Sequence, residues 1–306
     1  MTGFLRLMVF ACLVAFCSLA VSQESPKPLK DGLPVSTQTL LAGVRRPASK
    51  GVIKSVLKIS CPIDHKKGTG FVLSGIGIVV TNSHVAGPCT AVDLEGVSPV
   101  VNSPVKFSKL EQDPNRDLAI LCPSSPLPFG LTLGESGDPA VETEVETWGY
   151  PLSYEDAAPL LSRGYVAGYR VNVKRSANGT VGAPVKRLIV NGALNPGNSG
   201  GPLIDRGTGK VTGIVVEKWR LWSPDIEQVI QGFSHPGVST TGTFVRTNAQ
   251  GQQVPISDQE ALASTLQEFY DMSQVMVGEA ISVSELKAFI DEKKKDHFRC
   301  GPQPSN

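Results

Sequence analysis

Residues 195–204 read Asn195-Pro-Gly-Asn-Ser-Gly-Gly-Pro-Leu-Ile204, and the predicted fold depends on this stretch more than on any other. Ser199 stands among glycines, which allow backbone N–H groups to point inward without side-chain interference. A serine hydroxyl is a poor nucleophile unless a base removes its proton, a further group orients that base, and donors stabilise the developing oxyanion. Taken alone, the stretch could equally be an ordinary turn, so its meaning depends on partners elsewhere in the chain.

Two upstream runs supply those partners. Thr81-Asn-Ser-His-Val85 follows an apolar run, which places His84 at the end of a predicted strand, and Asp117 opens the apolar run Leu118-Ala-Ile-Leu121. An aspartate at the mouth of a buried strand is costly unless it is hydrogen-bonded, and an imidazole N–H is a suitable partner. For each residue alone, the alternatives are a surface histidine and a turn-capping aspartate. Together they give the order His84, Asp117, Ser199, which is the order of the chymotrypsin-type triad.

The serine stretch also fits Gly-x-Ser-x-Gly, the nucleophile elbow of α/β-hydrolases, which would make the protein a serine esterase. That elbow requires a helix directly after the serine and a histidine further along the chain. Here Gly200, Gly201 and Pro202 lead into a strand and a turn. The two downstream histidines, His235 and His297, lack a strand-end context. The esterase is therefore the less favoured alternative.

The rest of the chain predicts an all-β fold. It contains 31 glycines and 23 prolines, a composition typical of many short strands joined by turns. Strand-like runs form two successive groups, with a boundary expected near residues 150–162. Two helices are expected afterwards, over 257–272 and from about 284 to 295. The first begins with Ser257 and Glu260 at capping-box spacing.

Three motifs in register make the chain resemble the trypsin-like (chymotrypsin-fold) serine proteases, and most closely their HtrA/Deg branch. They are the runs that contain His84, Asp117 and Ser199. Gly68-Thr-Gly-Phe71 resembles a strand start of that family, and Gly278-Glu-Ala-Ile-Ser282 resembles the strand before its closing helix. The resemblance implies two perpendicular six-stranded β-barrels with a C-terminal helix, and the triad at the junction of the barrels.

The same resemblance sets the expected domain organisation. A protease domain over 51–306 would contain barrel one at about 51–150, barrel two at about 163–283 and the closing helix at about 284–295. A partly helical insert over 219–274 would interrupt it, either as a surface decoration or as a lid that selects substrates. No PDZ domain is expected after it. The oligomeric state is left open.

The resemblance also assigns the remaining site residues. The backbone N–H groups of Gly197 and Ser199 would form the oxyanion hole, and neither a metal nor an organic cofactor would be required. Asn198 replaces the aspartate that pairs with a freed N-terminal amine in the digestive enzymes, so no activation of that kind is expected. A pocket for small or medium apolar side chains would have the uncharged Ala193 near its floor and Val215, Val216 and Glu217 in a wall strand.

The N-terminus predicts export to a periplasmic or extracellular compartment. Arg6 precedes an apolar stretch from Leu7 to Ala20, which is shorter than the ~20 apolar residues of a membrane span. Residues 1–22 are therefore predicted to be a signal peptide, with an uncleaved anchor as the alternative. No stable membrane insertion is expected after cleavage. Residues 23–50 are polar and proline-bearing, and are expected to form a flexible arm.

Four cysteines remain after the predicted signal peptide, in a compartment that favours disulfides. Four cysteines allow three pairings. Because Cys61 and Cys89 bracket the strand pair that leads to His84, we favour Cys61–Cys89 and Cys122–Cys300, with free buried thiols as the alternative. No two of them have CxxC spacing, so no metal site is predicted.

Charge adds little to the functional prediction. The formal net charge is +1, and nothing in that balance calls for a nucleic acid as partner. The main hypothesis is an exported serine endopeptidase that acts on protein or peptide substrates. A catalytically silent binding protein with the protease fold is the second hypothesis, and the serine esterase is the third.

Overall fold

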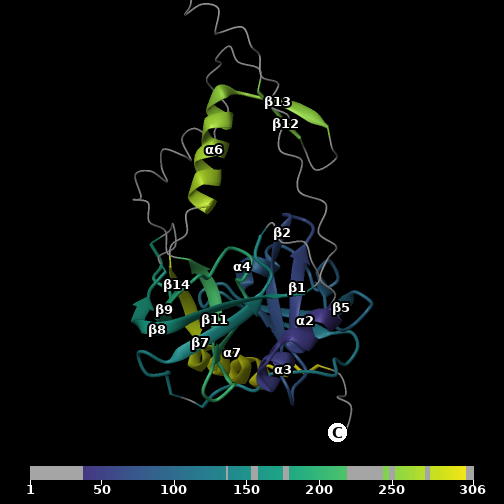
Figure 1. The fold of residues 1–306 in the computed structure, drawn as a ribbon, viewed down its shortest axis with the longest axis vertical. Helices are drawn as coiled ribbons and strands as arrows, with labels where there is room; N and C mark the ends of the chain where they lie inside the picture. The colour runs from purple at the N-terminus through teal and green to yellow at the C-terminus, as the bar shows by residue number, and fades with distance from the viewer. Residues whose placement is uncertain are drawn as a thin grey trace, which may run out of the picture. The chain divides into compact units, whose positions relative to one another are not determined.

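A computed structural model describes residues 37–135, 137–152, 158–174, 179–218, 244–247, 252–272 and 276–300. The predicted signal peptide, the first part of the predicted arm and the last six residues lie outside the described residues. Within the described residues the fold consists of two closed β-barrels with helices attached (Figure 1). The predicted all-β fold with two six-stranded barrels is confirmed.

Barrel one is an antiparallel barrel in the order β1-β2-β3-β6-β5-β4. Its strands are β1 (Val56–Cys61), β2 (Lys66–Val72), β3 (Val79–Thr81), β4 (Glu95–Val97), β5 (Val105–Asp113) and β6 (Leu118–Pro123). Alternate side chains of β1 point inward, where Leu57 and Ile59 are fully buried against Leu121. This is the period-two pattern of strands that close around an apolar interior.

Barrel two has the order β10-β11-β14-β9-β8-β7. Its strands are β7 (Glu144–Gly149), β8 (Leu160–Asn172), β9 (Val185–Gly192), β10 (Pro202–Asp205), β11 (Val211–Lys218) and β14 (Val277–Ser282). Strand β7 pairs with β8 and β10, so it belongs to this barrel. The boundary between the barrels therefore lies between Pro123 and Glu144, earlier in the chain than the predicted 150–162.

The two barrels share one apolar core. Phe71 and Ile120 of barrel one belong to the same buried cluster as Trp148, Ile214 and Ile281 of barrel two. Burial of an aliphatic or aromatic side chain stabilises a fold by about 1.5–3 kcal/mol, so a common cluster of this kind joins the barrels firmly. The relative placement of the residues that each barrel contributes to a site between them is fixed by this core.

The N-terminal part of the described chain differs from the prediction. Residues 37–50 were expected to belong to a flexible arm, but most of them lie in two helices, α2 (Thr37–Gly43) and α3 (Pro47–Ser55). Pro47 occupies the first turn of α3, where its missing N–H costs nothing. Val52 and Ile53 of α3 are buried in the shared core, and this apolar contact supplies the stability that polar residues of the segment lack.

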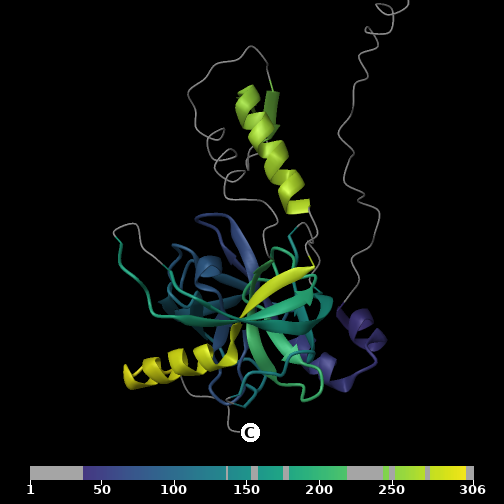
Figure 2. The same ribbon diagram turned by 90° about the vertical axis from the view of Figure 1, so that its left-hand side faces the viewer.

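The C-terminal helix was predicted correctly. Helix α7 (Val283–Lys295) follows β14 directly, and Figure 2 shows it in yellow along its length. Ser282 caps it by accepting a hydrogen bond from the Ser284 N–H, and the three lysines at its end suit the negative helix C-terminus. Its buried face, with Leu286, Phe289 and Ile290, packs into the shared core.

The predicted insert over 219–274 is described only in part. It contains a two-stranded sheet of β12 (Phe244–Thr247) and β13 (Gln253–Ile256), followed by α6 (Asp258–Met272). The capping box predicted for α6 is present, because the Glu260 carboxylate accepts from the Ser257 N–H at 2.8 Å and Ser257 Oγ accepts from the Glu260 N–H at 3.2 Å. The remaining parts of the insert lie outside the described residues.

Two disulfides join the favoured cysteine pairs, Cys61–Cys89 and Cys122–Cys300. The first closes a segment within barrel one, and the second ties the residues after α7 to strand β6. Among the described helices, none combines the length and the apolar character that a bilayer span requires.

Candidate active site

His84 and Asp117 form a hydrogen-bonded pair on barrel one. His84 lies in α4 (Ser83–Ala86), a short helix that begins two residues after β3, and Asp117 directly precedes β6. The His84 Nδ1 atom lies 2.8 Å from Asp117 Oδ2, and the His84 backbone N–H donates to Asp117 Oδ1 at 3.0 Å. One carboxylate therefore fixes both the ring and the backbone of the histidine.

Asp117 is buried and has an unusual backbone conformation. Only 7% of its surface is exposed, and its φ is +62°, in the left-handed region that aspartate tolerates better than most residues. Asn82 Nδ2 donates to its carbonyl oxygen at 2.9 Å. The His84 side chain is 44% exposed, so the ring is held from one side and open on the other.

Ser199 lies in the loop before β10, and close backbone approaches hold that loop. Gly197 and Gly200 have φ of +95° and +84°, values that favour glycine. A Cβ on Gly197 would lie 2.3 Å from the Tyr150 carbonyl oxygen, and one on Gly200 would lie 2.2 Å from the Thr69 carbonyl oxygen. The glycines that the sequence pattern singled out are therefore required by both conformation and space.

Strand β2 brings the two halves of the site together. The Thr69 N–H donates to the Ser199 carbonyl oxygen at 2.8 Å. A Cβ on Gly68 would lie 3.0 Å from that same oxygen and 2.6 Å from Cγ2 of Val85, the residue after His84. Ser199 thus lies beside the helix that carries the histidine, although 115 positions separate His84 and Ser199 in the sequence.

The Ser199 hydroxyl has a partner other than histidine. Its Oγ donates to the Val216 carbonyl oxygen at 2.6 Å. Val216 is the bulged residue of β11, because the pairing with β14 shifts between Val215 and Glu217. A serine hydroxyl reorients by rotation between staggered rotamers, so a different rotamer is needed to bring Oγ toward the imidazole.

Two backbone donors of the serine loop are left for a ligand. The N–H groups of Asn198, Gly200 and Gly201 donate to carbonyl oxygens at 2.8–3.0 Å. The N–H groups of Gly197 and Ser199 donate to no acceptor in the part of the chain that the structure describes. Two such donors close to a nucleophile are what a developing oxyanion requires.

The predicted pocket residues lie on strands that neighbour the serine loop. Val215 exchanges hydrogen bonds with the loop, donating to Gly201 and accepting from Gly200 at 2.9 and 2.8 Å. Ala193 is half-buried and follows β9, which pairs with the same strand β14 as β11 does. For Glu217 only the backbone position in β11 is described.

Thr69 is a site residue that the sequence singled out only as part of a family-like strand start. Its buried hydroxyl donates to the Gly197 carbonyl oxygen at 2.7 Å and accepts from the Tyr150 N–H at 3.1 Å. Orienting the Gly197 carbonyl in this way fixes the peptide plane that follows it. A hydroxyl between two segments distant in sequence leaves no local pattern by which it could have been found.

Two closed six-stranded barrels define a chymotrypsin-like fold, with an Asp–His pair on one barrel and a serine between glycines in a loop of the other. Residues 68–214 match the trypsin-like peptidase domain family. Protease Do-like 1 of Arabidopsis thaliana chloroplasts is 31% identical over 185 residues, which cover 58% of this chain and 38% of that protein. A probable periplasmic serine endoprotease, DegP-like, of Halomonas elongata is 31% identical over 48% of this chain and 28% of its own.

The crystal structure of the active form of the Rv3671c protease from M. tuberculosis aligns over 56% of this chain and 74% of its own, with 26% identity and a TM-score of 0.48. The chain spans less than half the length of the two curated relatives. Residues 68–214 are thus similar to trypsin-like peptidases, and these relatives are of the HtrA/Deg type.

Proposed function

We propose that this chain is an exported serine endopeptidase that uses His84, Asp117 and Ser199 as its triad. The observation that carries the proposal is the hydrogen-bonded His84–Asp117 pair, with Ser199 held beside it through strand β2. The family match and the endoprotease names of the relatives support the same reaction class. Their names supply no substrate for this chain beyond protein or peptide.

In the proposed reaction, His84 accepts the proton of the Ser199 hydroxyl while Oγ attacks the peptide carbonyl carbon. Asp117 holds the ring so that Nδ1 keeps its proton and stabilises the imidazolium that forms. The tetrahedral intermediate collapses, its C–N bond breaks, and His84 gives the proton to the leaving amine. Water then attacks the acyl-enzyme with His84 again as base, which releases the carboxylic acid and restores Ser199.

The two N–H groups of Gly197 and Ser199 are proposed to bind the oxyanion of both tetrahedral intermediates. Loss of one such donor costs about 3–4 kcal/mol in the barrier of other serine proteases. For the substrate residue before the cleaved bond, we propose a pocket lined by Ala193, Val215, Val216 and the backbone of Glu217. Alanine and valine carry no charge, so small or medium apolar side chains would fit better than lysine or arginine.

Export is proposed from the predicted signal peptide and is supported by the disulfides. Two disulfides in one domain are typical of an oxidising compartment such as the periplasm or the extracellular space. The DegP-like relatives are described as periplasmic, whereas Protease Do-like 1 is chloroplastic. We therefore propose a periplasmic or extracellular location.

A second candidate is a catalytically silent protein with the protease fold. The hydrogen bond from Ser199 Oγ to the Val216 carbonyl favours it, because a hydroxyl in this rotamer donates to the backbone and not to His84. The two candidates differ in whether Ser199 can leave that bond and react.

Reaction of the purified mature chain with a fluorophosphonate probe and a digest of proteome-derived peptides distinguish them. The wild type should be labelled and should cleave peptides, whereas Ser199→Ala should lose labelling and about 10⁶-fold in kcat. Ser74→Ala removes a hydroxyl from the turn after β2 and should leave both unchanged. Hydrolysis undiminished in Ser199→Ala would end the proposal, and a wild type that neither reacts nor cleaves would favour the silent protein.

A further inference from the structure

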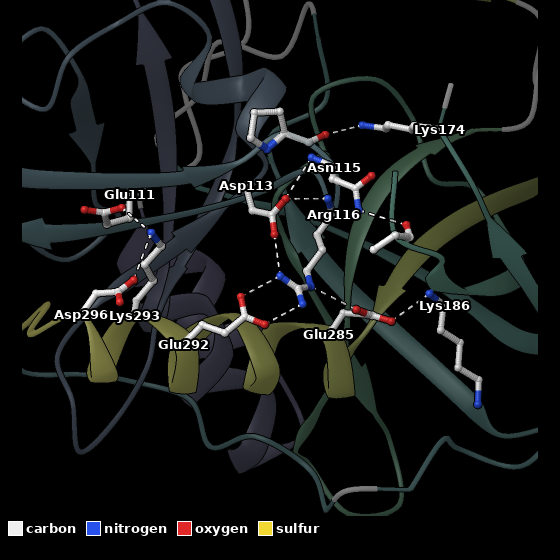
Figure 3. A network of polar contacts seen from close by, with 12 residues as sticks. Glu111, Asp113, Asn115, Arg116, Lys174, Lys186, Glu285, Glu292, Lys293 and Asp296 are labelled. Atoms are coloured by element: carbon white, nitrogen blue, oxygen red, sulfur yellow. Dashed lines mark hydrogen bonds and ion pairs between the residues drawn. The ribbon is translucent and has the colours of Figure 1, made fainter. Parts of the chain in front are cut away.

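The turn that leads into Asp117 is held by an ion-pair network that the proposed mechanism does not use (Figure 3). Strand β5 ends at Asp113 and β6 begins at Leu118, so the turn between them contains Arg116 directly before Asp117. Figure 3 shows the Arg116 guanidinium facing α7, with carboxylates on both sides of it.

Three carboxylates bind the Arg116 guanidinium. Glu292 accepts two parallel hydrogen bonds at 2.8 and 3.0 Å, Asp113 accepts one at 2.6 Å, and Glu285 accepts one from Nε at 3.3 Å. Glu285 and Glu292 both belong to α7, and they lie 169 and 176 positions from Arg116. A guanidinium can bind a carboxylate through two donors at once, a geometry that a lysine cannot reproduce.

The charge on Arg116 is secure. Partial burial alone would lower the pKa of the guanidinium, but hydrogen bonds and charge attraction from Glu292 and Asp113 outweigh that effect and raise it. Arg116 therefore keeps its positive charge across the pH range in which a peptidase works.

The backbone on either side of Arg116 is fixed as well. The second oxygen of Asp113 accepts from the N–H groups of Asn115 and Arg116, both at 2.9 Å. The Arg116 carbonyl oxygen accepts from Arg187 Nη2 of β9 at 3.3 Å. The turn is therefore held by its own first residue, by α7 and by barrel two.

Glu285 extends the network from α7 into barrel two. Its Oε1 accepts from the Lys186 backbone N–H of β9 at 2.9 Å, while its other oxygen binds Arg116. Asn115 Nδ2 donates to the Ala183 carbonyl oxygen at 3.0 Å, and Lys174 Nζ donates to that of Pro114 at 2.5 Å. A turn of barrel one thus takes its anchors from the other barrel and the closing helix.

Asp117 depends on these anchors because its own side chain supplies none. Within the described part of the chain, both of its carboxylate oxygens are used on His84. Its left-handed backbone is a conformation that surrounding structure must impose, at a cost on the order of 1–3 kcal/mol. The constraint comes from Asn82 on its carbonyl oxygen and from the preceding residue, Arg116, which is held by its N–H, its carbonyl oxygen and its guanidinium.

We propose that Arg116 is a positioning residue for the Asp117–His84 pair, through which helix α7 controls the catalytic geometry. The proposal rests on the proposed serine endopeptidase function. Arg116 touches neither substrate nor reacting atoms, so it acts by keeping the Asp117 carboxylate where the His84 ring needs it. Glu285 and Glu292 extend the same role to α7.

The test compares Arg116→Gln with Arg206→Gln as a matched control. Arg206 also pairs with two carboxylates, Glu144 and Glu146, and its side chain is 24% exposed against 20% for Arg116. Its carboxylate partners are on β7 and not in the Asp117 turn or α7, so it reports what the loss of a partly buried ion pair does to folding alone. Thermal unfolding of each variant is measured first, and kinetics are recorded well below the lower Tm.

In Arg116→Gln, kcat should fall about 10- to 100-fold, because small misplacements of a catalytic group have effects of that size, while KM changes little. Arg116→Lys should recover part of the loss, since an ammonium satisfies only some of the three carboxylates. Glu292→Gln should reduce kcat in the same direction and to a smaller extent. Arg206→Gln should keep the kcat of the wild type.

A proton NMR spectrum adds a readout that does not depend on hydrolysis. The His84 Nδ1–H that faces Asp117 should give a low-field resonance, which should weaken in Arg116→Gln and persist in Arg206→Gln. An active wild type whose kcat and resonance respond equally, or not at all, to the two substitutions would overturn the positioning role alone. A wild type that never hydrolyses peptides, but whose resonance responds to Arg116 alone, would refute the proposed function and support the positioning role.

Discussion

The two halves of the candidate site are held in different ways. On barrel one, a side chain is held in place, because the Asp117 carboxylate binds the ring of His84 as well as its backbone. On barrel two, the main chain of the serine loop is held, because the carbonyl oxygens of Ser199 and Gly197 accept from the N–H and the hydroxyl of Thr69. The His84 ring is therefore already oriented, while the Ser199 hydroxyl donates to the Val216 carbonyl oxygen.

This difference shows where the site is rigid and where it can move. A carboxylate with both oxygens in use leaves the imidazole one orientation, and reorganisation at the moment of reaction is avoided. The serine has a fixed main chain and a rotatable hydroxyl, so a single torsion separates the observed arrangement from a reactive one. Substitutions in the first half should change the orientation of the base, and those in the second half should change the path of the backbone.

The largest effect should come from breaking the first half with Asp117→Asn. An amide in place of the carboxylate favours the wrong tautomer of His84, and in another triad enzyme this change lowers kcat about 10⁴-fold. Steady-state kinetics on a peptide substrate measure the effect. Asp93→Asn, at an exposed turn where Asp93 accepts from Thr90, serves as the control and should keep full activity. A loss below tenfold for Asp117→Asn would show that the pair is not the orienting element.

A smaller effect is expected from Gly197→Ala in the second half. The new Cβ would meet backbone atoms of Tyr150 and Leu152 at 2.3 and 2.6 Å, so the loop must shift and displace its N–H donors. Loss of a donor should reduce kcat by about 10²–10³. Gly179→Ala is the matched control, because Gly179 has a similar φ of +85° but nothing within 4 Å of an added Cβ.

That control should lose about 1–2 kcal/mol of unfolding free energy from backbone strain and no activity. Urea denaturation and kcat are measured on both variants. Equal kcat for the two would mean that crowding at Gly197 does not govern the geometry of the serine loop.

The smallest effect on activity should come from removing the disulfides, which support the first half from a distance. In the chain-entropy account, the bond across 28 positions, Cys61–Cys89, contributes about 3–4 kcal/mol, and the bond across 178, Cys122–Cys300, about 5 kcal/mol. Replacing both cysteines of a pair by serine should therefore lower the unfolding free energy more for Cys122–Cys300 than for Cys61–Cys89. In both variants, kcat of the folded protein should change by less than tenfold. Chemical denaturation tests the order, and a reversed order would contradict the loop-length account.

Much of the fold could be predicted from local patterns. The capping box of helix α6 can be recognised from four consecutive residues. Strand β3, which ends at Thr81, lies in an apolar run. Strand β5 has no clear local signal, because its sequence VKFSKLEQD is largely polar and its second half is not buried. Pairing with β6 makes it a strand, and pairing partners are not visible in a local window.

The candidate site divides in the same manner. Serine, histidine and aspartate were found because each stands in a recognisable run, and their order along the chain pointed to one triad arrangement. The Val216 carbonyl and the Thr69 hydroxyl were not found, since a backbone acceptor has no residue signature and a threonine in a strand is common. Arg116 is adjacent to Asp117 in the sequence, but its role could not be predicted, because its partners on α7 are 169 or more positions away.

The sequence by itself determined the identities and order of the chemical groups, the two groups of strands and the cysteines available to pair. Tertiary structure alone decided that β7 joins the second barrel, that most of residues 37–50 are helical, and that the Ser199 hydroxyl points to Val216. The physical reason is range: propensity and periodicity act over a few neighbouring residues, whereas hydrogen-bond partners and burial are settled only when distant segments pack around a common core.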